Sequence, residues 1–470
     1  MRDPGGVLGE IARRKRVEVA ARLAGVPAAE LRARAQPSRR SLSAALASPG
    51  ARFIMEVKKA SPSSGALAPG RDAAEQAAAY AGAASAVSVL TDAHFFGGSL
   101  DDLAAVRRVF AGPILAKDFI VDPRQVTEAR LHGADAVLVL LALLDDPEVV
   151  AIVDEASRLG MEAVVEAHDA AEVRRAVRLG AGIVGINNRD LRTLDVDLVT
   201  TERLAPLVPP DRLVVAESGI ADRADVERLA PFADAFLVGT SLMRAARPAQ
   251  AARALAFGRV KVCGVRDLQD AEAAAFHGAG YVGLVMVPNT PRAVTAAAAA
   301  PIVTAARRAG AGVVGVFRNE KLMTVARAAH SLGLDAVQLH GEEDGAYIRG
   351  LRALLPDPVE IWAAGAVGRE VPAPRPGADR TLFDSKVGAR SGGTGVTFDW
   401  SRVHGRCDLG TGLLAGGLRP ENARAASRVG AWALDVASGV ERSPGRKDPG
   451  KLHAFFDALR LPARGEKSPC

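Results

Sequence analysis

Cysteine, aromatic residues and long apolar runs are scarce in this sequence of 470 residues, and each scarcity excludes a class of protein. The three cysteines, Cys263, Cys407 and Cys470, lie far apart and form no CxxC pair, so neither a disulfide framework nor a zinc site is predicted. The longest apolar run, AVLVLLALL from Ala136, covers about half of a membrane span, and the charged N-terminus lacks a signal-peptide core. We therefore expect no membrane association and a reducing, cytoplasmic location.

The excess of charge of one sign is also small. The chain has 60 Lys and Arg against 54 Asp and Glu, which gives a net charge of +6 and a pI near 9.4. The basic residues are scattered among acidic ones without forming a stripe, and only 4% of the residues are aromatic and able to stack on bases. Nucleic acid is therefore not an expected partner, and small anionic substrates account better for the charge.

The chain instead repeats one pattern from residue 53 onward: a short apolar run, a polar or glycine-bearing loop, and an Ala/Arg/Glu-rich stretch with helical period. Eight such runs read RFIMEV, AVSVL, PILAKDF, DAVLVL, EAVVEA, GIVGINN, RLVVAE and DAFLVG. Runs that are apolar on both faces and separated by helices indicate a parallel sheet, and eight such units close a (β/α)8 barrel. A doubly wound open sheet is the alternative, because periodicity alone does not prove closure.

The same pattern restarts at residue 259 and again gives eight apolar runs. They read RVKVC, GYVGLVMV, GVVGVF, AVQLH, VEIWAA, RTLFDS, LGTGLLAGG and WALDVAS. The predicted fold class is therefore α/β, with two tandem (β/α)8 TIM barrels over residues 1–256 and 257–470. Almost no linker separates them, because the stretch RALAFGRV at the boundary runs from a helix directly into a strand.

Charged and polar residues interrupt the apolar runs of the first half at their carboxyl ends, where barrels of this type place their active site. They are Glu56, Lys58, Lys117, Glu166, Asn187 and Glu217. Because side chains alternate along a strand, Glu56 and Lys58 share one face. Ion pairs that only hold the barrel together are the structural alternative, but several buried charges at successive strand ends favour catalysis.

Two glycine-bearing loops, AESGIAD and LVGTSLM, follow the seventh and eighth predicted strands of the first half. Barrels bind phosphate with backbone N–H groups in these two places. The loops offer Ser218, Gly219, Gly239 and Thr240 for this purpose.

Six motifs of the first half identify a family, in chain order: EVKKASPSSG, ILAKDFIVDP, VVEAHD, GINNRDL, AESGI and FLVGTSLMR. With them, residues 1–256 resemble indole-3-glycerol-phosphate synthase, which decarboxylates and ring-closes carboxyphenylaminodeoxyribulose phosphate (CdRP) to indole-3-glycerol phosphate. The resemblance implies that residues 1–50 form extra helices before the barrel.

The same resemblance implies a role for each polar residue at the carboxyl ends of the first-half strands, the end of the barrel called its mouth. Lys117 would be the general acid that helps to expel the hydroxyl, and Glu166 would be the general base. Lys58 would act on the substrate carboxylate or as an acid; a lysine among carboxylates stays protonated, which suits an acid. Orientation and charge stabilisation are implied for Glu56, Asn187 and Glu217, and binding of substrate or phosphate for Ser61, Arg189, Ser218, Gly219, Gly239 and Thr240.

Six motifs of the second half resemble phosphoribosylanthranilate isomerase: VKVCGV, VPNTPR, VQLHGEE, LFDSKVGARSGGTGVTFDW, LLAGGLRPEN and LDVASGVERSPGRKD. That family converts an aminoaldose to an aminoketose by an Amadori rearrangement. The resemblance implies that Cys263 takes the proton from C2 of the ribose, that Asp384 protonates the ring oxygen, and that Arg292 holds the anthranilate carboxylate. The residues it implies for substrate and phosphate are Gly416, Gly417, Asp435, Ser438 and Gly439.

The spacing around Cys263 supports an acid and a base in one mouth. Cys263 follows Lys261 by two residues on one face of its strand, and Asp384 ends an apolar run of another strand. A thiol is a poor base unless its thiolate is stabilised, so we expect cations or helix dipoles to favour the thiolate. Some relatives have Ser where this chain has Ala437, which matters little if backbone N–H groups bind the phosphate. His340 is expected to be a packed or capping residue without a metal role.

The product of the second half is the substrate of the first, so the two resemblances together indicate a bifunctional enzyme of tryptophan biosynthesis. We expect it to need no cofactor and no metal, to act on phosphorylated small molecules, and to be a monomer.

Two alternatives stay open. The second barrel could be the analogous isomerase of histidine biosynthesis, although that family has an aspartate where Cys263 stands. One half could instead bind sugar phosphates without catalysis. The presence of an acid and a base in each half argues against this, since binding alone requires neither.

Overall fold

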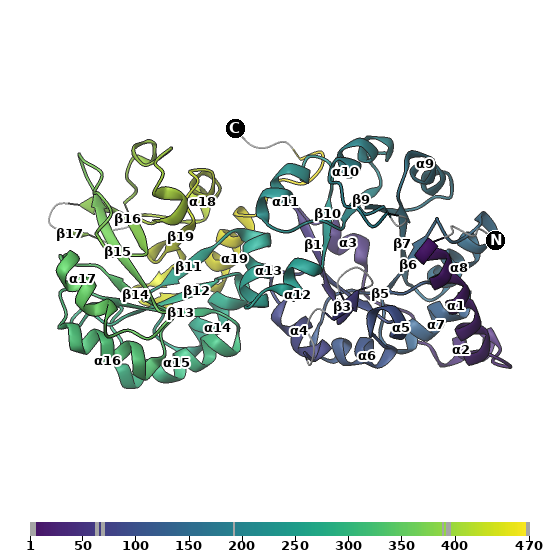
Figure 1. The fold of residues 1–470 in the computed structure, drawn as a ribbon, viewed down its shortest axis with the longest axis horizontal. Helices are drawn as coiled ribbons and strands as arrows, with labels where there is room; N and C mark the ends of the chain where they lie inside the picture. The colour runs from purple at the N-terminus through teal and green to yellow at the C-terminus, as the bar shows by residue number, and fades with distance from the viewer. Residues whose placement is uncertain are drawn as a thin grey trace. The chain divides into compact units, whose positions relative to one another are not determined.

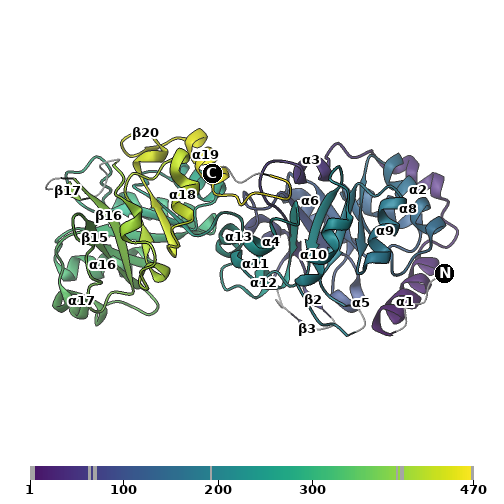
Figure 2. The same ribbon diagram turned by 90° about the horizontal axis from the view of Figure 1, so that it is seen from above.

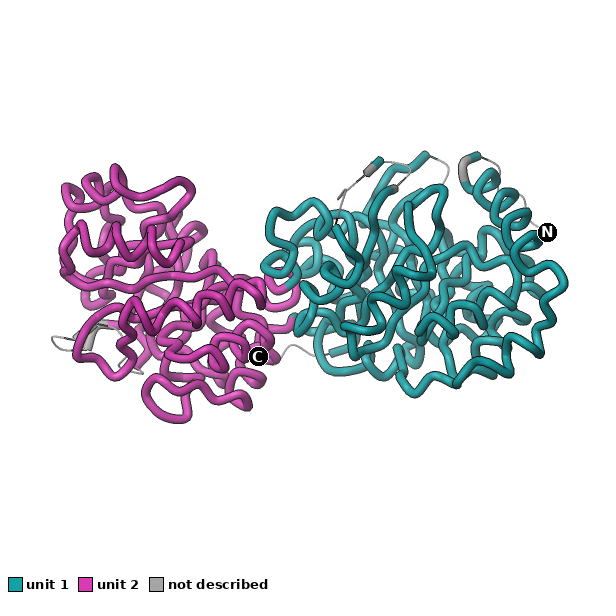
Figure 3. Tube along the Cα trace, turned by 90° about the horizontal axis from the view of Figure 1, so that it is seen from below, with its two compact units in different colours: residues 1–252, 461–470 teal, residues 253–460 magenta. Residues whose placement is uncertain are grey.

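The chain folds into two compact units, described here from a computed structural model in which helices surround strands (Figure 1; Figure 2). The structure describes residues 6–61, 65–66, 71–190, 193–387, 390–391 and 396–466. Residues 1–252 and 461–470 form the first unit, and residues 253–460 form the second (Figure 3). The division expected between residues 256 and 257 falls inside a helix, α13 (Pro248–Phe257). Residues 461–466, expected with the second domain, lie with the first unit, and residues 467–470 lie outside the described residues.

Eight parallel strands close the barrel of the first unit in the order β1-β10-β9-β8-β7-β6-β5-β4. The strands are β1 (Arg52–Val57), β4 (Ala86–Leu90), β5 (Ile114–Lys117), β6 (Ala136–Leu140), β7 (Glu162–Ala167), β8 (Ile183–Asn187), β9 (Leu213–Glu217) and β10 (Ala235–Val238). β1 closes the ring, because Arg52 pairs with Ala235 of β10 and Ile54 pairs with Ala86 of β4. The closed barrel predicted from the repeat is confirmed, and the open sheet is excluded.

Helices cover the outside of this barrel, so its strands are buried on both faces, as their continuous apolar sequences require. The helices are α4 (Ala73–Ala79), α5 (Ala93–Phe96), α6 (Leu100–Val109), α7 (Pro123–Leu131), α8 (Asp146–Arg158), α9 (Ala170–Arg178), α10 (Val199–Leu204), α11 (Arg223–Leu229), α12 (Thr240–Arg244) and α13. The extra N-terminal helices are confirmed as α1 (Gly6–Arg22), α2 (Ala28–Arg34) and α3 (Leu42–Leu46).

The second unit is also a closed barrel of eight parallel strands, in the order β15-β14-β13-β12-β11-β19-β18-β16, with β15 paired to β16. The strands are β11 (Val260–Cys263), β12 (Tyr281–Val285), β13 (Gly312–Phe317), β14 (Ala336–Leu339), β15 (Glu360–Val367), β16 (Arg380–Val387), β18 (Leu413–Leu414) and β19 (Ala433–Val436). The helices are α14 (Leu268–His277), α15 (Ala296–Arg308), α16 (Leu322–Leu332), α17 (Gly345–Arg352), α18 (Pro420–Ser427) and α19 (Pro449–Ala458). Within the described residues, no helix has the length and apolar character needed to cross a membrane.

Apolar side chains fill the interior of the second barrel near the starts of its strands. The Trp362 ring is fully buried and meets the Tyr281 and Trp432 rings at centroid distances of 5.4 Å and 6.0 Å. Leu382 and Leu413 belong to the same core cluster. With this end of the barrel filled by hydrocarbon and rings, its polar side chains gather at the opposite, carboxyl ends of the strands.

The C-terminal tail, residues 461–466, packs where the strands of the first barrel begin. The Leu461 carbonyl accepts a 2.8 Å hydrogen bond from the N–H of Ala51, the residue before β1. The Arg464 guanidinium donates to the carbonyl of Arg212, the residue before β9, at 3.2 Å. These hydrogen bonds are the physical reason why the tail belongs to the first unit, although the second barrel precedes it in sequence.

Candidate active sites

A cavity of about 360 Å³ lies at the carboxyl ends of the strands in the first barrel. Its lining includes Glu56, Lys58, Lys117, Glu166, Asn187, Arg189, Ser218, Gly219, Gly239 and Thr240, all singled out from the sequence. Glu217 reaches the same mouth through its contact with Lys117. Ser61 ends the short strand β2 (Ala60–Ser61), and its side chain lies outside the described residues.

Lys117 stands between two carboxylates at this mouth. Its Nζ atom is 3.1 Å from Glu56 Oε2 and 3.1 Å from Glu217 Oε2. Burial disfavours a charged amine, but the surrounding carboxylates outweigh it and raise the pKa of Lys117. Burial likewise disfavours the Glu56 carboxylate, yet Lys117 and Lys58, whose Nζ is 2.6 Å away, lower the pKa of Glu56 to about 2. Lys117 is therefore a protonated amine and Glu56 an ionised carboxylate.

Glu166 and Glu217 are two buried carboxyl groups held in different states. Burial raises the pKa of Glu217 to about 7, and Lys117 only partly offsets this. Burial acts on Glu166 too, but its hydrogen-bond and charge partners outweigh it and lower its pKa. One partner is Asn187, whose Nδ2 donates to Glu166 Oε1 at 2.9 Å. Two carboxyl groups with separated pKa values can serve as a base and an acid in one site.

His168 is a site residue that the sequence reasoning missed. It follows β7 and places Nε2 3.0 Å from Glu166 Oε1 and Nδ1 3.1 Å from Glu172 Oε2. The signal was present in the motif VVEAHD, where His168 stands two residues after Glu166. It was overlooked because a histidine just beyond a strand has no predictable direction.

The loops after β9 and β10 approach the cavity closely enough to require glycine at two points. A Cβ atom on Gly239 would lie 2.3 Å from Glu56 Oε1, and one on Gly219 would lie 2.5 Å from Val196 Cγ1. Gly219 also has a φ of +84°, in the left-handed region that favours glycine. The backbones of both loops therefore lie at the cavity, where their N–H groups can meet an anion.

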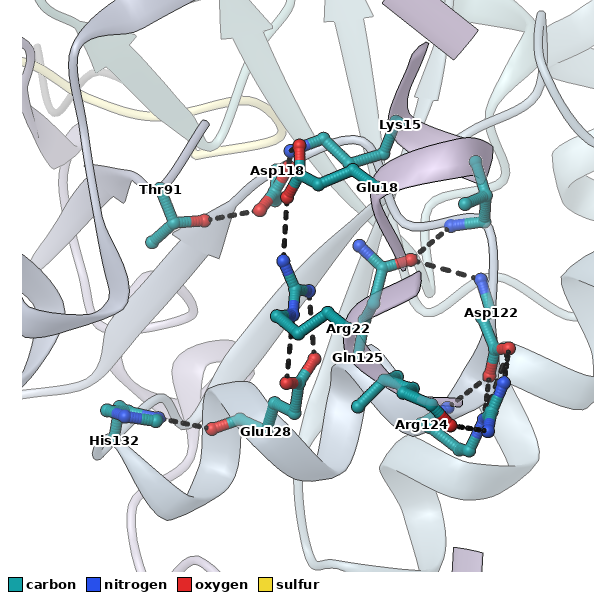
Figure 4. A network of polar contacts seen from close by, with 12 residues as sticks. Lys15, Glu18, Arg22, Thr91, Asp118, Asp122, Arg124, Gln125, Glu128 and His132 are labelled. Carbon is teal, nitrogen blue, oxygen red and sulfur yellow. Dashed lines mark hydrogen bonds and ion pairs between the residues drawn. The ribbon is translucent and has the colours of Figure 1, made fainter. Parts of the chain in front are cut away.

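The N-terminal helix α1 supplies part of the apolar wall, through Leu8 and Ile11. Lys15 of the same helix is buried, with Nζ 2.6 Å from Asp92 Oδ2. The same Nζ is 3.0 Å from Asp118 Oδ1, and Lys15 and Asp118 are both drawn in Figure 4. Despite burial, the two carboxylates raise the pKa of Lys15. Since Asp118 directly follows Lys117 of β5, this ion cluster ties α1 to the site.

In the second barrel, Cys263 ends β11 and is buried beside Lys261. The Lys261 Nζ atom lies 3.0 Å and 2.9 Å from the two carboxylate oxygens of Asp435. Burial raises the pKa of the Cys263 thiol; Lys261 acts against this, but Asp435 adds to it. Two cations near the thiol, Lys261 and Lys447, favour the thiolate as expected, but burial outweighs them, so the pKa of the thiol lies above its ordinary value.

Asp384 lies in β16 and is almost fully buried. Burial raises the pKa of Asp384 to about 6, against the effect of a 2.7 Å hydrogen bond from the N–H of Ser385. His340 Nε2 is 3.5 Å from Asp384 Oδ2, and burial lowers the pKa of His340 to about 4, so the imidazole is neutral near pH 7. His340 thus lies beside the predicted acid of this mouth.

Arg292 lies next to the loop that follows Cys263, since a Cβ on Gly264 would be 2.6 Å from Arg292 Cδ. Its guanidinium makes two contacts with Glu441, at 2.9 Å and 2.7 Å. Lys447 Nζ, in turn, is 2.9 Å from Glu441 Oε1 and donates to the Cys263 carbonyl at 2.6 Å. Neither Glu441 nor Lys447 was singled out from the sequence, because their strands are short and exposed residues surround them.

The two loops predicted to bind phosphate in the second barrel lie against each other. A Cβ atom on Gly439 would lie 1.9 Å from the carbonyl oxygen of Leu418. Gly416 and Gly417 both have positive φ, +83° and +62°, and Ser438 begins the short turn Ser438–Val440. The structure therefore brings all four predicted residues, Gly416, Gly417, Ser438 and Gly439, to one place. Among the described residues of the whole chain, no group of three or more His, Cys, Asp or Glu is arranged to hold a metal ion.

Comparison with known proteins gives a match for each barrel and for the pair. Residues 8–255 match the family described as Indole-3-glycerol phosphate synthase, and residues 260–458 match N-(5'phosphoribosyl)anthranilate (PRA) isomerase. Several curated relatives carry the name Tryptophan biosynthesis protein TrpCF. The relative from Yersinia pestis is 42% identical over 456 residues, covering 97% of this chain and 94% of its own length. The relative from Vibrio parahaemolyticus is 43% identical over 458 residues, covering 97% of this chain and 94% of its own length. The relative from Salmonella typhi is 43% identical over 455 residues, covering 97% of this chain and 99% of its own length. The two families suggested by the motifs are the two that match.

Proposed function

The chain belongs to the bifunctional enzyme family of tryptophan biosynthesis in which an indole-3-glycerol phosphate synthase precedes a phosphoribosylanthranilate isomerase, and from this we propose how its residues divide the two reactions. The second barrel is the isomerase, which converts phosphoribosylanthranilate to CdRP. The first barrel is the synthase, which converts CdRP to indole-3-glycerol phosphate with loss of CO2 and water. The barrels therefore stand in the reverse order of their reactions.

In the isomerase, Asp384 donates a proton to the ring oxygen while the C1–O bond of the furanose breaks, which leaves an iminium at the anthranilate nitrogen. Cys263 then takes the proton from C2, and the resulting enolamine tautomerises to the aminoketose. A pKa of about 6 keeps part of the Asp384 carboxyl protonated near neutral pH, as a general acid requires. Lys261 favours the Cys263 thiolate against burial, and Asp435 fixes the position of Lys261.

The ends of the isomerase substrate are bound by groups on different loops. Arg292 takes the anthranilate carboxylate, because its planar fork matches a carboxylate with two parallel hydrogen bonds. The phosphate is taken by backbone N–H groups of the paired loops, which include Gly416, Gly417, Ser438 and Gly439.

In the synthase, the ring carbon that carries the substrate carboxylate attacks the ketone carbon, whose oxygen takes a proton from solvent and becomes a hydroxyl. The carboxylate then leaves as CO2, and the electrons of its bond return to the ring. Lys58 holds that carboxylate until it departs, and Lys117 gives the departing hydroxyl the proton it needs to leave as water. Glu166 accepts the proton released when the new ring becomes aromatic. Glu56, Asn187 and Glu217 orient these groups, Arg189 contacts the substrate, and Ser61, Ser218, Gly219, Gly239 and Thr240 hold the phosphate.

The observation that best supports the synthase roles is the position of Lys117. Its Nζ lies 3.1 Å from each of two buried carboxylates on different strands, inside the cavity that the strand ends form. A partly buried cation with this support is costly to build unless it is used, and a protonated amine at a cavity is suited to general acid catalysis.

The roles are tested with purified full-length chain given phosphoribosylanthranilate alone, while anthranilate-type fluorescence and indole-3-glycerol phosphate are followed together. The wild-type chain should form the indole product without an added enzyme. Cys263→Ala should consume no phosphoribosylanthranilate yet convert supplied CdRP at the wild-type rate. Cys407→Ala is the matched control, because Cys407 is an exposed free cysteine, and it should behave as wild type. Equal loss of both activities in Cys263→Ala would refute the division into two sites.

We also propose that the chain acts as a monomer on phosphorylated small molecules and not on nucleic acid. Each mouth draws its proposed acid, base and phosphate groups from a single barrel of one chain, and the basic residues form no continuous stripe in the sequence. Light scattering at assay concentration should give the mass of a single chain, 48.8 kDa.

A further inference from the structure

His168 lies between two carboxylates at the mouth of the synthase barrel. Its Nε2 is 3.0 Å from Glu166 Oε1, an ion-pair contact, and its Nδ1 is 3.1 Å from Glu172 Oε2. The backbone N–H of His168 also donates to Glu172 Oε2, at 2.8 Å. Glu172 is itself placed by helix α9, because its N–H donates to the N-cap residue Asp169 at 2.8 Å. The ring is therefore fixed from the side away from Glu166.

The two contacts define the charge of this ring. The Nδ1 atom is within hydrogen-bond distance of Glu172, whereas Nε2 makes no hydrogen bond to a described group, so its contact with Glu166 is a charge contact, which is favourable only if the ring carries a positive charge. Burial disfavours the imidazolium, but Glu166 and Glu172 outweigh burial and raise the pKa of His168 to about 10. Near neutral pH the ring is thus a cation that faces two anions.

The ionised state of Glu166 is favoured more by the His168 cation than by any other group described at the mouth. Lys117 contributes at longer range, but it is already in contact with Glu56 and Glu217, at 3.1 Å each. Glu217 is a further buried carboxyl close to Glu166, whose ionisation would oppose that of Glu166. Without His168, Glu166 would be a buried carboxylate with only the neutral amide of Asn187 in contact.

The contacts also set the orientation of Glu166. Both Asn187 Nδ2 and His168 Nε2 approach the same oxygen, Oε1, at 2.9 Å and 3.0 Å. Glu166 lines the cavity, and its second oxygen, Oε2, has neither of these contacts, which leaves it for a proton from a molecule bound there.

We propose that His168 is a positioning residue of the synthase, which keeps Glu166 ionised and turns one of its oxygens toward the substrate, with Glu172 as the anchor of His168. This inference rests on the proposed role of Glu166 as general base. The charged and titratable groups that face the pair are Glu172 from α9, Lys117 from β5 and Glu217 from β9.

The test compares His168→Gln, His168→Ala and Glu172→Gln in the full chain, with CdRP supplied as the synthase substrate. Removal of the imidazolium raises the pKa of Glu166, so the acidic limb of the synthase kcat profile should move to higher pH. A shift of about one to two pH units lowers kcat some 10-fold to 100-fold on that limb and leaves more activity at high pH. KM for CdRP should change little, because His168 is not among the described residues that line the cavity.

The variants differ in what they keep, which separates charge from shape. His168→Gln keeps a hydrogen-bond donor without the charge, so it should show the same pH shift as His168→Ala. Glu172→Gln keeps the imidazole and should give a smaller shift in the same direction. The isomerase activity of each variant should equal that of wild type, which reports that the chain is folded. His132→Gln is the matched control, since His132 Nδ1 contacts only the backbone carbonyl of Glu128 among the described groups, at 2.8 Å.

Two results would overturn the proposal. One is an unshifted synthase pH profile in both His168 variants, whether kcat is unchanged or uniformly lower. The other is a shift in His168→Ala that His168→Gln restores, because hydrogen bonding and not charge would then be the role. Glu166→Gln separates this inference from the assignment of Glu166 as the base. If Glu166→Gln keeps synthase activity, the base assignment fails. If Glu166→Gln is inactive and the pH profile of His168→Gln is unshifted, only the role of His168 is rejected.

Discussion

Arg292 and Glu441 form a two-point ion pair in the isomerase barrel, with Nε 2.9 Å from Oε1 and Nη2 2.7 Å from Oε2. This is the fork geometry that an arginine also offers to a substrate carboxylate. Glu441 is held in turn by Lys447, which contacts the carbonyl of Cys263. The arginine proposed to bind anthranilate is thus oriented by an acidic residue that is linked to the proposed base.

Replacement of Arg292 by lysine keeps the charge but removes the fork. We expect KM of the isomerase for phosphoribosylanthranilate to rise about 10-fold to 100-fold, since a hydrogen bond to a charged group contributes roughly 1.5–3 kcal/mol. The synthase reaction with supplied CdRP should not change. Steady-state fluorescence assays give both constants. An unchanged KM would assign the carboxylate to another residue, and Arg352→Lys, at a more exposed pair with Asp379, is the control.

Lys117→Met should inactivate the synthase and change how the stability of the first barrel depends on pH. In wild type the pKa of Glu56 is held at about 2, below its ordinary value of 4.5, so its ionisation stabilises the fold above about pH 4.5 and the contribution is lost as pH falls toward 2. Without Lys117 the pKa of Glu56 rises and that of Glu217, already about 7, rises further, so ionising the two groups costs the variant more stability than the wild type as pH increases. The deficit in melting temperature of the first barrel should therefore grow from pH 5 to pH 8.

The control for this prediction is Lys59→Met. Lys59 makes a similar contact, 2.7 Å from Asp102, but its side chain is 36% exposed, so removal should cost less than about 1 kcal/mol at any pH. A Lys117→Met deficit that stays constant from pH 5 to pH 8 would contradict the coupling of Lys117 to the two carboxylates. Synthase kcat should fall about 100-fold or more, the usual contribution of a general acid.

The sequence predicts the barrels well because their signal is local. The run RFIMEV coincides with β1 (Arg52–Val57), and the polar residues that interrupt such runs meet at one cavity, since parallel strands place their carboxyl ends together. Groups that depend on a tertiary contact were not predictable. His168 needs Glu172 from the next helix, and the pKa of Cys263 depends on whether Lys261 is already paired.

Lys15→Met should loosen α1 and weaken binding of CdRP. The Lys15 side chain is 2% exposed and lies between Asp92 and Asp118, so removal of the amine leaves two carboxylates without their shared cation. Since Leu8 and Ile11 of α1 line the cavity, KM for CdRP should rise several-fold, with a smaller effect on kcat. Hydrogen exchange of residues 6–22 should increase in the same variant.

Arg22→Met is the matched control on the same helix. The Arg22 side chain is 37% exposed and pairs with Glu128 at 3.0 Å (Figure 4), so its loss should cost less than about 1 kcal/mol and leave KM unchanged. If Lys15→Met accelerates exchange in α1 but KM stays at the wild-type value, the helix does not contribute to substrate binding.

A chain that ends at Arg460 should lose stability in the synthase barrel while the isomerase barrel keeps its own. The deletion removes the hydrogen bonds from Ala51 to Leu461 and from Gly50 to Glu466, together with the Arg464 contacts before β9. At roughly 0.5–1.5 kcal/mol for each hydrogen bond, the loss sums to about 2–5 kcal/mol. This corresponds to a fall of about 5–15 °C in the temperature at which synthase activity is lost.

The two activities of one chain provide the internal comparison, because heat inactivation can be followed for each in the same sample. A chain that ends at Glu466 keeps every tail contact described above and should behave as wild type. Arg464→Ala should give a partial effect in the direction of the full deletion, since the Leu461 hydrogen bond remains. If both activities of the chain ending at Arg460 are lost at the same lowered temperature, the tail stabilises the whole chain and not the first barrel in particular. If neither inactivation temperature changes, the tail hydrogen bonds contribute nothing measurable to the stability of the first barrel.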